Sequence, residues 1–286
     1  MSDFFGQSVP FFKMQGCGND FVVIDNRELG LPEAEMKDWV TKICARAFGV
    51  YADGLFFIDN APEGSGLDYR WHFFNSDGSR AEMCGNASRC MGRLAYELGA
   101  APREHTFGTD AGPIKAEVIL EGEKAGEVKI QLTPAQGMTL NTELEVDGQT
   151  LTVHHVDTGV PHAVVFLDDV NAIDIKRLGA AIRYHDHFAP AGCNANFAQV
   201  LDKDTMLLRT YERGVEDETY ACGTGAAATQ IVAHELGLTN AEAALTTSGG
   251  EVLTIALENG NAFLQGAATL VFKGELYPES MGLKLP

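Results

Sequence analysis

Residues 84–99 read CGNASRCMGRLAYELG, and residues 222–237 read CGTGAAATQIVAHELG. Both stretches open with Cys-Gly, carry Glu thirteen residues after the cysteine and end in Leu-Gly. A threonine follows each cysteine at 25 residues, and a glycine follows at 28. These equal spacings favour duplication of one strand–helix unit over coincidence. We therefore predict two similar domains, each with a cysteine at the N-terminus of a helix.

The segments around these helices carry strand signals. Residues 143–153 contain apolar and polar side chains in alternation on both sides of Asp147-Gly148, and residues 253–264 do the same around Asn259-Gly260. Asp-Gly and Asn-Gly between such runs indicate hairpins. Apolar side chains recur at helical spacing over residues 36–47, which predicts one further helix. The predicted fold class is α+β with antiparallel pairing.

Length and composition narrow the class of protein. The 286 residues correspond to about two domains, and 45% apolar with 21% charged residues is ordinary globular usage. The net charge of −19 opposes binding to nucleic acid or to an anionic membrane. We find no signal-peptide pattern and no apolar run long enough to span a membrane. The six cysteines form no C-x-x-C pair, so we expect reduced thiols, no metal site and a cytoplasmic enzyme.

Cys84 and Cys222 differ from an ordinary buried cysteine such as Cys44. A thiol at a helix N-terminus can have its pKa lowered to about 3.5–7.5, and the amides beside it can hold a carboxylate. Two such thiols on opposite faces of one carbon could remove a proton from one side and deliver a proton to the other. Racemisation or epimerisation of an amino acid needs this arrangement, and helix N-termini would stabilise the carbanion without a cofactor.

Several further motifs accompany the two cysteines. Taken singly, residues 75–79 are typical of a turn, residues 212–214 of a surface charge pair, and residues 13–21 of a glycine-bracketed loop before a strand. Together, in order and along nearly the whole chain, the motifs resemble the diaminopimelate epimerase family. They comprise residues 14–21, 75–79, 82–86, 159–162, 192–197, 212–214 and 221–225.

The resemblance implies a fold and a reaction. It implies two pseudo-symmetric domains, each with antiparallel strands wrapped around a central helix, with residues 1–130 plus 274–286 in the first and residues 131–273 in the second. It implies cofactor-independent interconversion of LL- and meso-diaminopimelate, a precursor of lysine and of the cell wall. It also implies a homodimer.

The same resemblance assigns roles to residues. It implies that Cys84 and Cys222 are the acid/base pair, with His162 and Glu212 beside the thiols. The residues implied to contact substrate are Asn19, Asn75, Gly85, Asn86, Asn194, Glu212, Arg213, Gly223 and Thr224. The chain departs from the family's usual residues at Tyr51, Ala87 and Cys193, which bears on the range of substrates.

Three alternatives stay open at the level of sequence. One is a related racemase of another amino acid, such as histidine or proline. The second is a non-catalytic protein of the same fold that binds an amino acid, although two positioned cysteines would then add oxidation risk without benefit. The third is a hydrolase with a cysteine nucleophile, in which one of the two thiols would be superfluous.

Overall fold

The computed structural model describes residues 6–286, and its internal contacts divide them into two compact units. Unit 1 contains the chain up to Ile130 together with Ala267–Pro286, and unit 2 contains Gln131–Gly266. The sequence prediction placed the second boundary after residue 273, which falls inside strand β17 (Thr269–Leu276). β17 pairs with β1 (Val9–Gly16) on both sides of a bulge at Val271, so the whole strand belongs to unit 1. The boundary therefore lies earlier, at Ala267.

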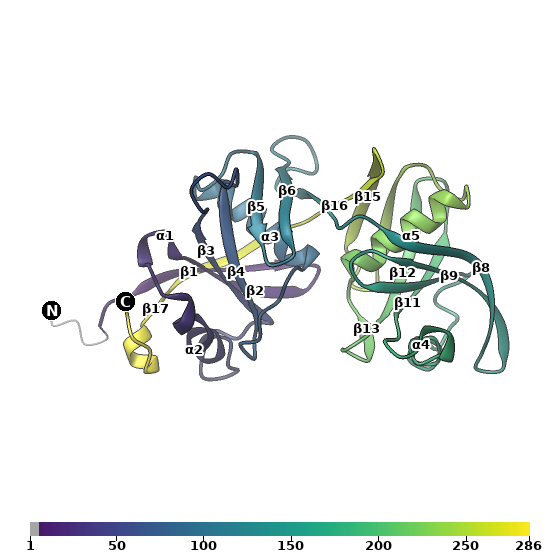
Figure 1. The fold of residues 1–286 in the computed structure, drawn as a ribbon, viewed down its shortest axis with the longest axis horizontal. Coiled ribbons are helices and arrows are strands. Elements are labelled where there is room, and N and C mark those ends of the chain that lie inside the picture. Colours follow the sequence, from purple (N-terminus) through teal and green to yellow (C-terminus); the bar gives the residue numbers. More distant parts are fainter. Residues whose placement is uncertain (1–5) are drawn as a thin grey trace. The chain divides into compact units, whose positions relative to one another are not determined.

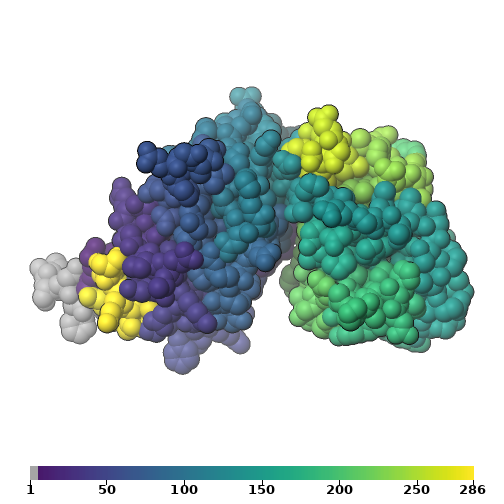
Figure 2. Space-filling view, viewed as in Figure 1, coloured from purple at the N-terminus to yellow at the C-terminus, as the bar shows by residue number. Residues whose placement is uncertain are grey.

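Unit 1 contains both ends of the described chain (Figure 1). Figure 2 shows the yellow C-terminal segment against the purple N-terminal part, as the β1–β17 pairing requires. Besides β1 and β17, its elements are β2 (Asn19–Asp25), α1 (Asn26–Leu29), α2 (Glu33–Ile43), β3 (Gly54–Asn60), β4 (Tyr69–Asn75), α3 (Gly85–Glu97), β5 (Glu104–Thr109), β6 (Gly112–Val118), β7 (Val128–Gln131) and a 3-10 helix (Pro278–Met281).

Unit 2 has a corresponding set of strands and helices, joined by loops of different length. Its elements are β8 (Gln136–Val146), β9 (Gln149–Asp157), β10 (Pro161–Phe166), α4 (Ile175–Arg183), a 3-10 helix (Asp186–Phe188), β11 (Asn194–Val200), β12 (Thr205–Glu212), β13 (Asp217–Thr219), α5 (Gly223–Glu235), β14 (Glu242–Thr247), β15 (Val252–Glu258) and β16 (Asn261–Gly266). The two predicted hairpins are confirmed as β8–β9 and β15–β16.

The strand order is the same in the two units. It is β17-β1-β2-β3-β4-β5-β6-β7 in unit 1 and β8-β9-β10-β11-β12-β14-β15-β16 in unit 2. The parallel pairs are β2–β3 and β4–β5 in unit 1, and β10–β11 and β12–β14 in unit 2. The predicted antiparallel pairing therefore does not hold for these four pairs. A helix connects the two strands of each, and such a crossover is what parallel strands require.

One helix in each unit is central and the other is peripheral. Strands wrap around α3 and α5, which pack against β1, β2 and β6 and against β9, β10, β15 and β16 respectively. Small residues allow this close approach: a Cβ on Gly92 of α3 would lie 3.1 Å from the Val128 side chain. Together with the α+β content and the repeated strand order, this confirms the predicted fold class.

The peripheral helices cover the other side of each set of strands. In unit 1, Met36 and Trp39 of α2 form a core with Val22, Leu55 and Phe74. The corresponding core under α4 includes Leu178, Ile182, Ala163, Ala195 and Tyr211. The predicted helix over residues 36–47 ends at Ile43, and Ala47 has a positive φ of 68°. Among residues 6–286, no helix is long and apolar enough to cross a membrane.

Candidate active site

The two cysteines occupy equivalent places in the two units. Cys84 is the N-cap of α3 with φ −146° and ψ 128°, and Cys222 is the N-cap of α5 with φ −121° and ψ 110°. The first intrahelical bonds run from Ser88 N–H to Cys84 O (2.8 Å) and from Ala226 N–H to Cys222 O (2.9 Å). Amides earlier in the helix have no intrahelical acceptor, so both helix starts can bind an anion. The predicted N-terminal cysteines are confirmed.

In unit 1, Cys84 lies beside one of the predicted substrate contacts. Its Sγ is 3.7 Å from Oδ1 of Asn19, the first residue of β2. Asn19 in turn donates through Nδ2 to Asp53 Oδ2 (2.6 Å), which fixes the orientation of its amide. The expected loop over residues 13–21 is instead the end of β1, a Cys17-Gly18 turn and the start of β2. Strand pairing therefore holds Asn19 in place.

Asn75 ends β4 and belongs to a hydrogen-bonded turn. Its Nδ2 donates to Ser79 Oγ (3.0 Å), and Ser79 Oγ donates to Asp77 Oδ1 (2.6 Å). The hydrogen bonds from Ser79 lower the pKa of the Asp77 carboxyl, which is fully exposed. In this structure Asn75 thus bonds within its own turn, and the residues 75–79 are the turn that the sequence predicted.

A buried arginine stabilises the start of α3. Arg89 is fully buried, and its guanidinium donates to Gly85 O (3.2 Å) and to Asn86 Oδ1 (3.0 Å). It also donates to Cys17 Sγ (3.2 Å) and to Ala267 O (3.2 Å). Arg89 therefore orients the two predicted carboxylate-binding residues of unit 1 and places a positive charge behind them.

In unit 2, Cys222 has polar neighbours at the first turn of α5. Its Sγ is 3.4 Å from Thr224 Oγ1, and the Thr224 carbonyl accepts from Thr158 Oγ1 (3.0 Å). A Cβ on Gly225 would lie 2.3 Å from Asn196 Oδ1, so only glycine fits there. This turn is consequently held by Thr158, which precedes β10, and by Asn196 of β11.

Asn194, Glu212 and Arg213 come together at the ends of β11 and β12. The Arg213 amide donates to Asn194 Oδ1 (2.7 Å), and the Arg213 guanidinium donates to Ala191 O (3.3 Å). Glu212 Oε2 accepts from Thr219 Oγ1 (3.0 Å). Burial raises the pKa of Glu212, and the hydrogen bond from Thr219 partly opposes that shift.

His162 is a fully buried residue of β10. It lies opposite Asn194 in the parallel pairing of β10 with β11. Its Nδ1 is 3.1 Å from Asn196 Nδ2. Burial lowers its pKa to about 3, with smaller contributions from the charges of His155 and Arg213. The imidazole is therefore neutral at physiological pH.

Three of the other cysteines are buried thiols. Burial raises the pKa of Cys44, of Cys90 and of Cys193 to about 12 in each case. These thiols stay protonated at neutral pH and cannot act as bases. The interpretation of Cys44 as a buried apolar residue is confirmed.

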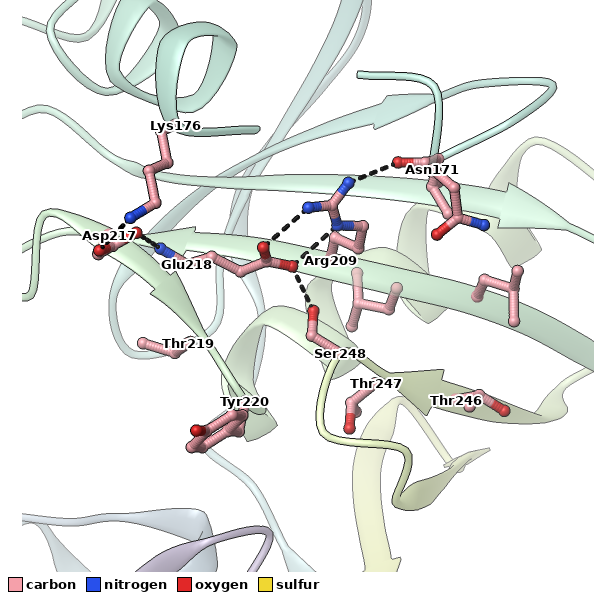
Figure 3. Close-up of a pocket in the computed structure, with 13 residues that line it drawn as sticks. Asn171, Lys176, Arg209, Asp217, Glu218, Thr219, Tyr220, Thr246, Thr247 and Ser248 are labelled. Carbon is pink, nitrogen blue, oxygen red and sulfur yellow. Dashed lines mark hydrogen bonds and ion pairs between the residues drawn. The ribbon is translucent and has the colours of Figure 1, made fainter. Parts of the chain in front are cut away.

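Figure 3 shows a pocket of about 690 Å³ in unit 2 that contains none of the predicted site residues. Its charges are already paired: Arg209 donates to both carboxylate oxygens of Glu218 (2.8 Å each), and Lys176 binds Asp217 (2.8 Å). Thr219, which binds Glu212, also lines this pocket. These ion pairs hold β13, the segment that leads to Cys222, against β12 and α4. Within residues 6–286, no three His, Cys, Asp or Glu side chains are grouped as metal ligands.

Three residues of the site were missed from the sequence: Arg89, Asn196 and Thr219. Arg89 follows Cys84 by five residues inside the quoted repeat, and a buried helix position occupied by arginine could have been noticed. Asn196 lies inside the family motif at residues 192–197, but no role was assigned to it, and Thr219 carries no signal. The partners of both come from other strands.

Solved structures share this fold at low sequence identity. A phenazine biosynthesis protein of the PhzF family from Bacillus anthracis matches with a TM-score of 0.69 and 14% identity, covering 94% of this chain and 99% of that one. A probable proline racemase from Agrobacterium radiobacter K84 matches with a TM-score of 0.67 and 14% identity, covering 94% and 92%. The fold class of this chain is thus one that it shares with a phenazine biosynthesis protein and a probable proline racemase.

Sequence similarity narrows this class to one family. The sequence model described as diaminopimelate epimerase matches residues 11–137 and 154–271. The diaminopimelate epimerase of Aquifex aeolicus is 48% identical over 280 residues, covering 95% of this chain and 99% of that protein. The corresponding protein of Archaeoglobus fulgidus is 41% identical over 278 residues, covering 94% and 96%. The chain belongs to the diaminopimelate epimerase family and is an epimerase, an enzyme of the isomerase class.

Proposed function

We propose that this enzyme interconverts LL- and meso-diaminopimelate by a two-base mechanism in which Cys84 and Cys222 exchange protons with opposite faces of one α-carbon. One cysteine, as thiolate, removes the α-proton, and the other, as thiol, donates its proton to the opposite face. The reverse reaction exchanges these roles. The observation that carries the proposal is the equivalence of the two N-cap cysteines in units with the same strand order.

The helix starts supply the electrostatic part of the catalysis. Removal of the α-proton leaves a carbanion whose charge spreads into the carboxylate, so donors fixed around that carboxylate lower the barrier. We assign this role to the backbone amides of Gly85, Asn86, Gly223 and Thr224. Because these donors belong to the protein backbone, we propose that the reaction uses neither a metal nor an organic cofactor.

Asn194, Glu212 and Arg213 are proposed to recognise the amino acid head that does not react. A carboxylate and a guanidinium side by side match an ammonium and a carboxylate, and Arg213 can bind a carboxylate with two parallel hydrogen bonds. We propose that Asn19 and Asn75 contact the same substrate from unit 1. Glu212, through its raised pKa, and His162 are proposed to influence the charge of the nearby thiols.

Arg213→Lys tests this recognition role. The substitution keeps the positive charge but loses the two-pronged geometry of the guanidinium. We expect kcat/KM for diaminopimelate to fall on the order of thirtyfold or more, because a buried carboxylate left half-paired costs about 2–5 kcal/mol. Unchanged steady-state kinetics would remove Arg213 from the substrate site.

The cellular setting follows from the family resemblance. We propose that the enzyme works in the cytoplasm, as a homodimer, on the route to lysine and peptidoglycan. The partner we propose is a small amino acid substrate, and the net charge of −19 argues against nucleic acid or an anionic membrane. Light scattering of the purified chain tests the dimer directly.

Hydrogen exchange in heavy water tests the reaction itself. With LL-diaminopimelate, the product should gain deuterium at the α-carbon first, while recovered substrate stays largely protiated at early times. Equal early label in substrate and product would instead indicate one polyprotic base that reaches both faces. Exchange on proline or histidine but not on diaminopimelate would favour the alternative racemase. Binding without exchange on any of these would identify a binding protein.

A further inference from the structure

We infer that Asn196 is a positioning residue that holds His162 in the tautomer with the proton on Nε2, so that the buried ring presents a hydrogen-bond donor and not a proton acceptor. This inference deepens the proposed function and rests on it for the role in the reaction. The assignment of the tautomer stands on the geometry of unit 2 alone.

The orientation of the Asn196 amide is determined by its neighbours. One of its two terminal atoms lies 2.9 Å from Ala163 O, a backbone carbonyl that can only accept. That atom must therefore be the nitrogen, Nδ2. The other terminal atom lies 3.0 Å from Thr210 Oγ1, whose hydroxyl can donate to it. Both contacts agree, so the amide has a single consistent orientation.

This orientation assigns the proton of the His162 ring. Nδ2 lies 3.1 Å from His162 Nδ1, and it has a second hydrogen beyond the one given to Ala163 O. An amide nitrogen cannot accept a hydrogen bond, so Nδ1 must accept and carries no proton. In a neutral imidazole the proton is then on Nε2. The burial that lowers the pKa of His162 is consistent with a neutral ring.

The proton on Nε2 is a buried donor without a partner. Nε2 of His162 has no hydrogen-bond acceptor among the residues that the structure describes. Buried donors are nearly always paired in native proteins, so an unpaired one calls for an explanation, of which a role in catalysis is one. The Asn196 side chain that fixes the ring also lies against Gly225, in the first turn of the helix that Cys222 caps. If the proposed function holds, Nε2–H serves an anion of the reaction, namely the thiolate or the substrate carboxylate.

The equivalent positions of unit 1 show that the fold does not require this arrangement. By strand register, His162, Asn196 and Thr210 correspond to Phe21, Phe56 and Phe73. There the rings pack together, with centroids 4.9 Å apart for Phe21 and Phe56 and 4.5 Å apart for Phe56 and Phe73. In unit 1 an apolar cluster fills these positions. The fold therefore does not need polar residues there, and His162, Asn196 and Thr210 have a role other than packing.

Nitrogen-15 NMR of histidine-labelled protein tests the tautomer. We expect the wild-type His162 ring to show Nε2 protonated and Nδ1 unprotonated, with its signals assigned by their loss in His162→Gln. This measurement needs no variant at Asn196 and no active enzyme. A protonated Nδ1 in the wild-type protein would overturn the inference.

Asn196→Asp tests the positioning role. A carboxyl oxygen carries at most one hydrogen where the amide nitrogen carries two, so it cannot donate to both Ala163 O and His162 Nδ1. We expect the ring proton to move to Nδ1 and kcat to fall on the order of a hundredfold, as for loss of one fixed donor to an anion, with a smaller change in KM. An unchanged tautomer, or a shifted tautomer with unchanged kcat, would overturn the positioning role.

Gln230→Glu is the matched control. Gln230 is also a fully buried amide in unit 2, and it donates to Asn240 O (2.8 Å) and accepts from Thr239 Oγ1 (3.1 Å). Within residues 6–286, no hydrogen bond joins its side chain to the His162 ring. We expect a similar loss of thermal stability in both variants and a change of the His162 tautomer only in Asn196→Asp. Equal losses of kcat in both would assign a merely structural role to Asn196. Failure of the wild-type enzyme on diaminopimelate would refute the proposed function and leave the tautomer result intact.

Discussion

The two units share a strand order but differ at the positions around their cysteines. Arg89 lies five residues after Cys84, whereas Ala227 holds that place after Cys222. Conversely, unit 2 buries His162, Asn196 and Thr210 where unit 1 buries three phenylalanines. A duplicated backbone thus carries two different electrostatic environments. In unit 1 the buried, positively charged Arg89 lies behind the start of α3. In unit 2 the neutral, hydrogen-bonded Asn196 and its partners lie beside the start of α5.

Loss of either N-cap thiol should have the largest effect. We expect Cys84→Ala and Cys222→Ala each to lower kcat by about a hundredfold to ten-thousandfold, the usual contribution of one acid/base group. Binding of diaminopimelate, measured by calorimetry, should persist because the backbone amides remain. Cys90→Ala is the control, since that thiol has a pKa of about 12 and should leave kcat near the wild-type value. Near-normal epimerisation by either single-thiol variant contradicts the two-base assignment.

Arg89→Leu should come next, and its main effect should be on stability. The substitution leaves Gly85 O and Asn86 Oδ1 without their buried donor, and each unpaired polar group costs about 1–3 kcal/mol. We expect the free energy of unfolding in urea to fall by about 2–4 kcal/mol and KM for diaminopimelate to rise.

Arg93→Leu is the control for Arg89. Arg93 lies on the same helix, bonds Glu97 and Ala268 O, and is partly exposed. Its replacement should cost about 1 kcal/mol or less. Equal losses at both positions would mean that Arg89 adds nothing specific to the start of α3.

His162 should make the free energy of unfolding depend on pH, whereas its counterpart Phe21 does not titrate and should not. Burial lowers the folded-state pKa of His162 to about 3, below its ordinary value of 6.5. The unfolded chain therefore binds this proton first as pH falls, and the stability that His162 contributes above pH 6.5 is lost between 6.5 and about 3. The slope should reach about 1.4 kcal/mol per pH unit.

Urea unfolding of wild type and His162→Gln across this pH range measures that slope. The difference between the two proteins isolates His162, because the other buried histidines are common to both. Parallel stability curves would show that His162 takes up its proton equally in the folded and unfolded states.

Thr210→Val should have the smallest effect. Asn196 keeps its bonds to Ala163 O and His162 Nδ1 and loses only the donor to Oδ1. We expect a loss of about 1 kcal/mol in thermal unfolding and a fall in kcat of only a few fold. Thr239→Val, which removes the equivalent donor to Gln230, should match the loss of stability and leave kcat unchanged. If both variants lowered kcat, the effect of Thr210→Val could not be assigned to the hydrogen bonds around His162.

Local signals in the sequence were sufficient for the two cysteine-capped helices and the two hairpins. A helix start, an Asp-Gly turn and an alternating strand depend on residues that are neighbours in the chain, so their patterns are readable without a fold. The equal spacings in residues 84–99 and 222–237 were also sufficient to predict two similar domains. The family resemblance then supplied the site residues, of which the structure joins Cys84 to Asn19 and Asn194 to Arg213.

Tertiary structure decided the rest. The parallel pairs, the return of β17 to β1 and the boundary at Ala267 depend on which distant strands meet, and strand composition does not specify a partner. The roles of Arg89 and Asn196 likewise appear only when carbonyls from other segments surround them. By itself, the sequence determined the turns of the two hairpins and the starts of the two cysteine-capped helices, because those choices depend on residues that are neighbours in the chain. The burial of a guanidinium or an imidazole, and hence its charge and proton position, is a property of the packed interior alone.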